Sequence, residues 1–119
     1  MKHSGPLYAQ IAKELGTSIL SRRIAPGEKL PPVRQIAAYF RANPQAVCRA
    51  VSELEKASLV QKQRGTGMYS TQDISLIASV RQQLVRCYVR ELRTQMDMLG
   101  YSRAEMLTMI KSINARDNV

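Results

Sequence analysis

The segment RGTG, residues 64–67, places two glycines and a hydroxyl beside a basic side chain, a combination suited to holding a phosphate. Glycine-rich loops that hold a nucleotide lie between a strand and a helix N-terminus, so that the helix dipole meets the phosphate. Here β-prone runs at residues 59–63 and 68–71 flank the glycines, which predicts a β-hairpin instead. We expect a hairpin tip that exposes backbone N–H groups to phosphate, with Lys62 and Arg64 adding positive charge.

Residues that could carry out catalysis or bind a metal are few and scattered. His3 is the sole histidine and lies before the first predicted element, and Cys48 and Cys87 belong to no Cys-x-x-Cys pair. No Cys-His pair or histidine-based triad can be assembled, and we interpret Glu53 and Glu55 as solvated helix charges. We therefore expect no catalytic residue, no cofactor, no metal site and no disulfide framework.

The 119-residue chain has a formal net charge of +9, and this charge is unevenly distributed. Residues 1–71 contain 11 Lys/Arg and 4 Asp/Glu, whereas residues 72–119 contain 7 and 5. A basic first part favours a polyanionic partner over a merely soluble basic surface. Because no segment reaches the ~18 apolar residues of a membrane span and the start lacks the apolar stretch of a secretory signal, we expect a cytoplasmic protein without membrane contact.

Three helices are predicted before the hairpin. Apolar residues recur at spacings of three and four over residues 7–23 and again over residues 33–40. A third helix is expected over residues 43–57, with Asn43 as its N-cap and Pro44 as its first residue. Two helices joined by a short link and followed by a hairpin with a basic tip are arranged in the order of a winged helix-turn-helix.

The third helix has one apolar and one polar side. Its apolar side consists of Val47, Ala50, Val51 and Leu54. Gln45, Arg49 and Ser52 lie opposite, and such hydrogen-bonding groups can contact the edges of nucleobases. By itself this pattern also fits an ordinary solvated helix face. Because the predicted hairpin follows directly, we interpret Asn43, Gln45, Arg49 and Ser52 as candidate DNA-contacting residues.

Residues 72–99 form a long helical pattern that is followed by a second helix. Gly100 is expected to end the first helix, and Ser102 with Glu105 predicts the capping box of the second. Apolar residues recur at spacings of three and four along both helices, which gives each a wide apolar face that needs a partner surface. The same helical hairpin of a second chain would supply it, and folding back onto the winged domain is the alternative. The candidate dimer-interface residues are Ile77, Leu84, Tyr88, Leu92, Leu107 and Ile110.

Several motifs follow one another in order over residues 6–71. They are PLY at the first helix, PGEKLP before the second, VRQIA within it, SELE late in the third, and RGTG in the hairpin. Together they resemble the N-terminal domain of the GntR family of bacterial transcription regulators. The versions PVRQIA and NPQAVCRA are most similar to its YtrA subfamily, whose members carry a short two-helix tail after the winged domain.

The resemblance implies a transcription regulator, a repressor by family habit, that binds double-stranded DNA as a homodimer. A two-fold dimer would place its recognition helices about 34 Å apart, one turn of DNA, and would bind a palindromic operator. Arg34 matches a second-helix arginine that contacts DNA, and Gln45 and Arg49 match positions open to the groove. Gly65, Thr66 and Gly67 match the wing.

We therefore predict a mostly α chain with a small β-hairpin. A winged helix-turn-helix DNA-binding domain is expected over residues 1–71 and a helical hairpin for dimerisation over residues 72–119. The sequence departs from the family pattern at four places, which leaves the operator sequence open. These are Pro32 for a serine, Arg41 for a turn glycine, Cys48 for a serine, and Ala57-Ser58 for an acidic-glycine pair.

Three alternatives stay open at this point. A winged helix also serves as an interaction module, so contact with protein or RNA without operator recognition competes with DNA binding. The tail is too short for a separate ligand domain, so an effector, if one exists, is expected between the winged domain and the tail helices. We interpret Cys48 as a small half-buried residue, with a redox role as the alternative.

Overall fold

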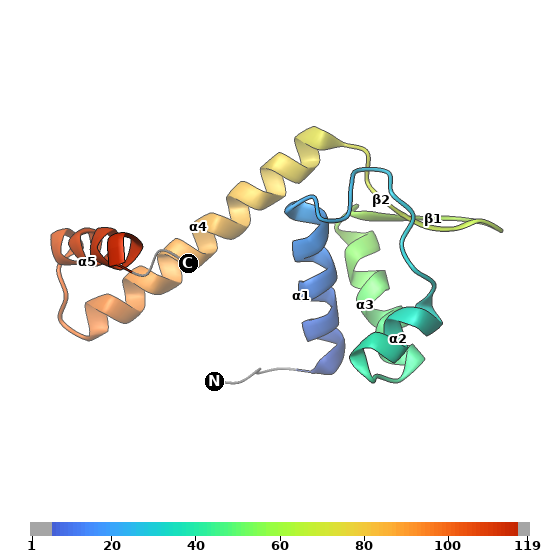
Figure 1. Ribbon diagram of the computed structural model, residues 1–119, viewed down its shortest axis with the longest axis horizontal. Helices are drawn as coiled ribbons and strands as arrows, with labels where there is room; N and C mark the ends of the chain where they lie inside the picture. Colours follow the sequence, from blue (N-terminus) through green and yellow to red (C-terminus); the bar gives the residue numbers. More distant parts are fainter. Residues whose placement is uncertain (1–5, 117–119) are drawn as a thin grey trace. The chain divides into compact units, whose positions relative to one another are not determined.

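The computed structural model describes residues 6–116, and their side chains as far as Ile113. It contains helices and one β-hairpin, labelled in Figure 1. In chain order these are α1 (Leu7–Leu20), α2 (Val33–Phe40), α3 (Pro44–Lys56), β1 (Val60–Gln63), β2 (Gly67–Ser70), α4 (Ile74–Met98) and α5 (Arg103–Arg116). The chain divides into two compact units, Met1–Val80 and Arg81–Val119. The predicted class, mostly α with one small hairpin, is confirmed.

The core of the first unit lies between α1 and α3, which pack along each other (Figure 1). The apolar faces predicted for both helices are buried there: Ile11, Leu15, Ile19 and Leu20 from α1, and Val47, Ala50, Val51 and Leu54 from α3. Gly16 faces α3, and a Cβ built on it would make an ordinary van der Waals contact, at 3.4 Å, with Cδ2 of Leu54. The same stripe that predicted the helices therefore also holds them together.

A short turn joins α2 to α3, as a helix-turn-helix requires. Asn43 caps α3, because its Oδ1 accepts a hydrogen bond of 2.8 Å from the backbone N–H of Gln45. Pro32 precedes α2 and provides no side-chain cap. Arg41, which stands where the family pattern has a turn glycine, ends α2 in the left-handed conformation, with φ 53° and ψ 47°.

The hairpin is antiparallel, with register pairs Val60↔Ser70, Gln61↔Tyr69, Lys62↔Met68 and Gln63↔Gly67. A bridge between Lys29 and Tyr69 adds the α1–α2 loop to its edge. Ser70 fastens the two together, although it is a polar residue only 1% exposed. Its Oγ donates to the carbonyl oxygen of Ala25 at 2.6 Å and accepts from the backbone N–H of Glu28 at 3.1 Å. The position of the hairpin, which we call the wing (residues 60–70), is thus fixed by the loop.

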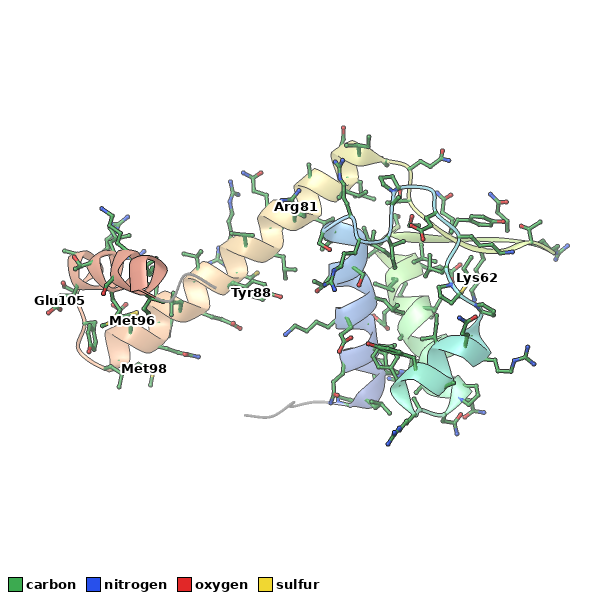
Figure 2. All side chains as sticks on the ribbon, in the orientation of Figure 1. Lys62, Arg81, Tyr88, Met96, Met98 and Glu105 are labelled. Atoms are coloured by element: carbon green, nitrogen blue, oxygen red, sulfur yellow. The ribbon has the colours of Figure 1, made fainter. Side chains whose placement is uncertain are left out.

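The second unit contains the later part of α4, a turn and α5. Gly100 has φ 89° and follows the helix end, as expected for this position. Ser102 and Glu105 form the predicted capping box: the Glu105 N–H donates to Ser102 Oγ at 3.1 Å, and the Ser102 N–H donates to Glu105 Oε1 at 2.7 Å. Met106 is buried, while most other apolar side chains of α5 are exposed; Figure 2 shows Glu105 and Met96 near this turn.

One predicted helix boundary differs from the observed one. The first helix was expected to reach residue 23 but ends at Leu20, and Arg22 beyond it has φ 67°, which no α-helix accommodates. The compact units divide after Val80, and the first turns of α4 belong to the first unit. The predicted domain boundary after Thr71 stays a prediction. Among the described residues, no helix is long and apolar enough to cross a membrane.

Candidate nucleic-acid interface

The exposed side of α3 carries the candidate base-contacting residues. Asn43, Gln45 and Arg49 are exposed, and Ser52 is half-buried. The opposite side of the helix is buried against the rest of the first unit, so these polar groups have a rigid support. Asn43 also uses its Oδ1 for the helix cap, which leaves its amide nitrogen for other contacts.

Arg49 does not extend freely into solvent. Its Cζ lies 3.9 Å from the centre of the Tyr8 ring, which comes from the first turn of α1. This distance is within the range of a cation–π interaction. A guanidinium stacked on a ring keeps N–H donors at its edge, so the contact positions Arg49 without consuming its hydrogen-bonding capacity.

The wing ends in a tight turn at residues 63–66. The backbone N–H of Thr66 donates to the carbonyl oxygen of Gln63 at 3.0 Å, and the Thr66 hydroxyl donates to the same oxygen at 3.2 Å. Gly65 has φ 80°, a value that favours glycine at the third residue of a β-turn. Its N–H has no acceptor in the part of the chain that the structure describes, so it is available to an anion. The donors of Thr66, in contrast, are already used within the turn.

Three basic side chains lie on or beside the wing, and their surroundings differ. Lys62 forms an exposed ion pair with Glu55 of α3, with 3.6 Å between Nζ and Oε1, which weakens its positive field; Figure 2 labels Lys62 on β1. Arg64 is exposed and has no ion pair within the described ranges. Lys29 was not predicted, yet its side chain reaches the wing: its Nζ is 3.7 Å from where a Cβ on Gly67 would be.

The predicted residues of α2, α3 and the wing thus all lie in the first unit, and each is exposed or half-buried. They are Arg34, Asn43, Gln45, Arg49, Ser52, Lys62, Arg64, Gly65, Thr66 and Gly67. Their contacts with DNA remain predictions. Sequence reasoning missed Lys29, and it did not identify a contact for Tyr8, which lies within the apolar spacing of residues 7–23. No local pattern could have placed either side chain, because both approach residues that are distant in the sequence.

The tail residues need one correction. Ile77 was a candidate for the dimer interface but is 0% exposed and belongs to the first compact unit, so it is a core residue and not available to a second chain. Ile77 follows the same spacing of three and four as the exposed residues of α4, so the sequence pattern could not show that Ile77 is buried. Leu84 is half-buried, and the remaining candidates are exposed; these are Tyr88, Leu92, Leu107 and Ile110.

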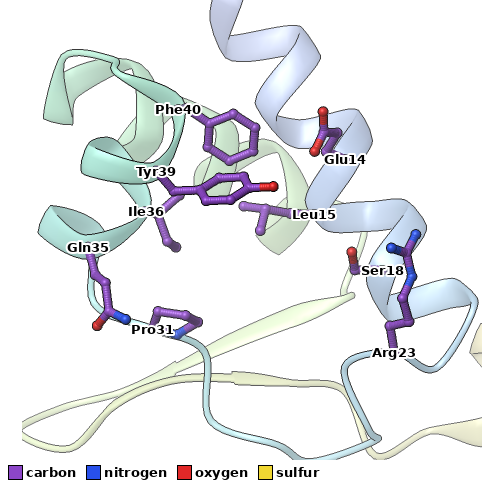
Figure 3. Close-up of a pocket in the computed structure, with 9 residues that line it drawn as sticks. All are labelled: Glu14, Leu15, Ser18, Arg23, Pro31, Gln35, Ile36, Tyr39 and Phe40. Atoms are coloured by element: carbon purple, nitrogen blue, oxygen red, sulfur yellow. The ribbon is translucent and has the colours of Figure 1, made fainter.

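The described residues also contain a hollow and an exposed cysteine thiol. A hollow of about 290 Å³ lies between α1 and α2. Its lining, drawn in Figure 3, includes Leu15, Ile36, Phe40, Glu14 and Arg23. It includes none of the candidate DNA-contacting residues. No group of His, Cys, Asp and Glu suited to a metal ion occurs among the residues with described positions; His3 lies outside them. Cys48 is exposed, contrary to the expected half-buried position, and a lone exposed thiol identifies no site.

Comparison with known proteins places the chain in a family. Residues 7–69, more than half of the chain, match the model of the bacterial regulatory proteins of the gntR family. The uncharacterised HTH-type transcriptional regulator YhcF of Bacillus subtilis is 32% identical over 109 residues, covering 92% of this chain and 90% of the relative. The HTH-type transcriptional repressor YtrA of the same organism is 28% identical over 115 residues, covering 96% and 88%.

Solved structures agree with these sequence matches. A GntR-family transcriptional regulator from Listeria monocytogenes superposes with a TM-score of 0.88 at 28% identity, over 94% of this chain and 98% of that one. A transcriptional regulator from Oenococcus oeni shares the fold, with a TM-score of 0.77 at 18% identity, over 95% and 94%. Both similarities extend through the tail helices. This chain therefore belongs to the GntR family of bacterial regulatory proteins and is a regulator of the YtrA-like type.

Proposed function

We propose that this regulator acts in the cytoplasm as a homodimeric repressor that binds a palindromic operator. The observation that carries the proposal is the joint exposure, in one compact unit, of the polar side of α3 and a basic wing. The similarity to the repressor YtrA, which extends over 88% of that protein, supports the direction of regulation.

In this proposal α3 enters the major groove. Gln45 and Arg49 are exposed near the start of the helix, where side chains of a recognition helix contact base edges. An amide pairs in a bidentate manner with adenine, and a guanidinium with guanine, so these two residue types carry base preference. Ser52, farther along the helix and half-buried, contributes to the edge of the same surface.

The wing and α2 hold the phosphate backbone in this proposal. Arg34 at the start of α2, and Arg64 with the free N–H of Gly65 at the hairpin tip, present donors that need no particular base. Lys29 adds a further positive charge beside the wing. Lys62 must give up its ion pair with Glu55 before it can contact a phosphate. Binding should therefore weaken steeply as salt rises.

In this proposal the tail helices form the interface through which two chains dimerise. Large apolar side chains remain exposed along α4 and α5, among them Val85, Tyr88, Val89, Leu92, Leu107, Ile110 and Ile113. A monomeric protein rarely exposes such a series, whereas a two-fold packing of two helical hairpins would bury it. The isologous arrangement would also impose two-fold symmetry on the DNA site.

Selection from a random duplex library, with binders measured again at two salt concentrations, tests the proposal. We expect an inverted repeat with half-sites about one helical turn apart that is still preferred at moderate salt. Binding that depends on salt but not on sequence would contradict operator recognition. Preference for single-stranded RNA or for a protein would support the interaction-module alternative instead.

The dimer is tested separately by Leu107→Asp or Ile110→Asp, each of which places a charge on an exposed apolar position of α5. We expect the mass measured by sedimentation to fall from dimer to monomer, because a buried unpaired carboxylate opposes association. Ser112→Asp introduces the same charge on another side of the same helix and should leave the mass unchanged. A dimer that survives the first two substitutions would contradict the proposed interface.

A further inference from the structure

Tyr8 and Arg49 form a contact that joins the start of α1 to the exposed side of α3. The Cζ of Arg49 lies 3.9 Å from the centre of the Tyr8 ring, although the two residues are far apart in the sequence. Tyr8 is half-buried, and one helical turn later Ile11 is fully buried, so the ring stands on a rigid helix. Arg49 itself is exposed and forms no ion pair within the described residues.

These features together restrict Arg49 without neutralising it. A free arginine side chain samples many rotamers, and each must be given up when the guanidinium pairs with a base. Stacking on a ring fixes the plane of the guanidinium in advance and leaves its edge donors accessible. A carboxylate partner would fix the side chain too, but would occupy those donors and cancel the charge.

We propose that Tyr8 is a positioning residue for the Arg49 guanidinium in base recognition, with guanine as the base that this geometry suits. The inference rests on the proposed function, in which Arg49 faces the major groove. A bidentate contact with O6 and N7 of guanine requires a guanidinium fork that is held in place, and the position of Cζ 3.9 Å from the centre of the Tyr8 ring restricts that fork. Tyr8 therefore raises discrimination between bases and not only the stability of α1.

Three substitutions separate positioning from packing. Tyr8→Phe keeps the ring and its quadrupole, and Tyr8→Leu keeps apolar bulk but removes the ring. Tyr39→Leu removes an exposed tyrosine of α2 whose ring packs edge-on against Phe40. The probe is the duplex selected by the full wild-type chain from a random library. The second duplex has the same sequence except at one base pair. That base pair is the one at which the wild type prefers one base and Arg49→Ala does not.

The ratio of the two affinities is the readout, because a partly unfolded sample lowers both affinities alike and leaves their ratio unchanged. We expect Tyr8→Leu to lower the ratio by about two- to fivefold, the size of an exposed cation–π interaction, while Tyr8→Phe and Tyr39→Leu keep it. In the Arg49→Ala background, Tyr8→Leu should have no further effect on the ratio.

A second measurement needs no DNA. The guanidinium carbon of Arg49 lies over the Tyr8 ring, so we expect the neighbouring Nε–H proton to resonate upfield in the NMR spectrum of the wild type and of Tyr8→Phe, and to return to its ordinary position in Tyr8→Leu. An ordinary shift in the wild type would overturn the inference, since the stack would not exist in solution.

The outcomes distinguish this inference from the proposed function. If Arg49→Ala abolishes discrimination at a base pair but Tyr8→Leu retains it, positioning by Tyr8 is overturned and base recognition by Arg49 stands. If Arg49→Ala changes no base preference, or if the wild type selects no preferred duplex, the recognition step itself fails and the inference fails with it. Equal loss of the ratio in Tyr8→Phe and Tyr8→Leu would assign the effect to the hydroxyl and overturn the stacking argument.

Discussion

The two glycines of the wing should respond differently to the same substitution. Gly67 has φ 132°, and a Cβ built on it would lie 2.8 Å from Cε of Lys29. Gly65 has φ 80°, a left-handed value that other residues adopt at a cost, and a Cβ there would meet nothing within 4 Å. Gly67→Ala should therefore destabilise the first unit more than Gly65→Ala does.

The expected magnitudes follow from the backbone angles. A left-handed non-glycine residue costs about 1–2 kcal/mol, and Gly→Ala regains about 0.4–1 kcal/mol by restricting the unfolded chain, so Gly65→Ala should cost about 1 kcal/mol or less. Rarer positive-φ conformations cost of order 1–3 kcal/mol, so we expect about 2 kcal/mol for Gly67→Ala. Displacing the flexible end of Lys29 adds little to this.

Urea unfolding followed by circular dichroism measures both costs, at one fixed protein concentration because association changes apparent stability. Lys29→Ala, alone and combined with Gly67→Ala, tests the role of crowding. If backbone strain dominates, as we expect, the two free-energy changes add within about 0.5 kcal/mol. Equal costs at the two glycines, or rescue of Gly67→Ala by Lys29→Ala, would refute the argument from φ.

Three further substitutions test contacts of the winged unit. Ser70→Ala removes both hydrogen bonds of the hydroxyl and should lower the free energy of unfolding by about 1–2 kcal/mol. The loss stays this small because the N–H of Glu28 and the carbonyl oxygen of Ala25 also bond each other, so neither group is left without a partner. Exposed Ser79→Ala in α4 is the control and should change the free energy of unfolding by less than about 0.5 kcal/mol in urea. Glu55→Gln frees Lys62, so binding to a random duplex should tighten and the slope of log K against log salt should steepen by up to about 1; an unchanged slope in a salt titration would mean that Lys62 contacts no phosphate. Asn43→Ala removes the cap of α3 and should cost about 1 kcal/mol in thermal or urea unfolding, and no loss would show that the cap does not stabilise the helix.

Local signals in the sequence were sufficient to predict the elements around the candidate site. The Asn43-Pro44 start of α3, the Gly100 end of α4, and the Ser102 and Glu105 capping box all appear in the structure as expected. Each depends on backbone groups within a few residues, so its physics is contained in a short stretch of sequence.

Features that depend on distant residues were not predictable in this way. Tyr8 and Lys29 approach Arg49 and Gly67 only because α1 packs on α3 and the α1–α2 loop pairs with the wing. Ile77 shares its spacing with exposed residues of α4, and only the tertiary packing of the first unit buries it. Periodicity identifies an apolar face but not the surface that covers it.

The most direct test of sequence-specific recognition by α3 compares Arg49→Ala with Arg64→Ala on the selected duplex and on a scrambled one. We expect Arg49→Ala to weaken binding to the selected duplex by about 1–3 kcal/mol and to leave binding to the scrambled one nearly unchanged. Arg64→Ala should weaken both alike and reduce the salt slope by about 1. If Arg49→Ala instead weakens binding to both duplexes equally, Arg49 is a phosphate contact, and base recognition by Arg49 on the exposed side of α3 is contradicted.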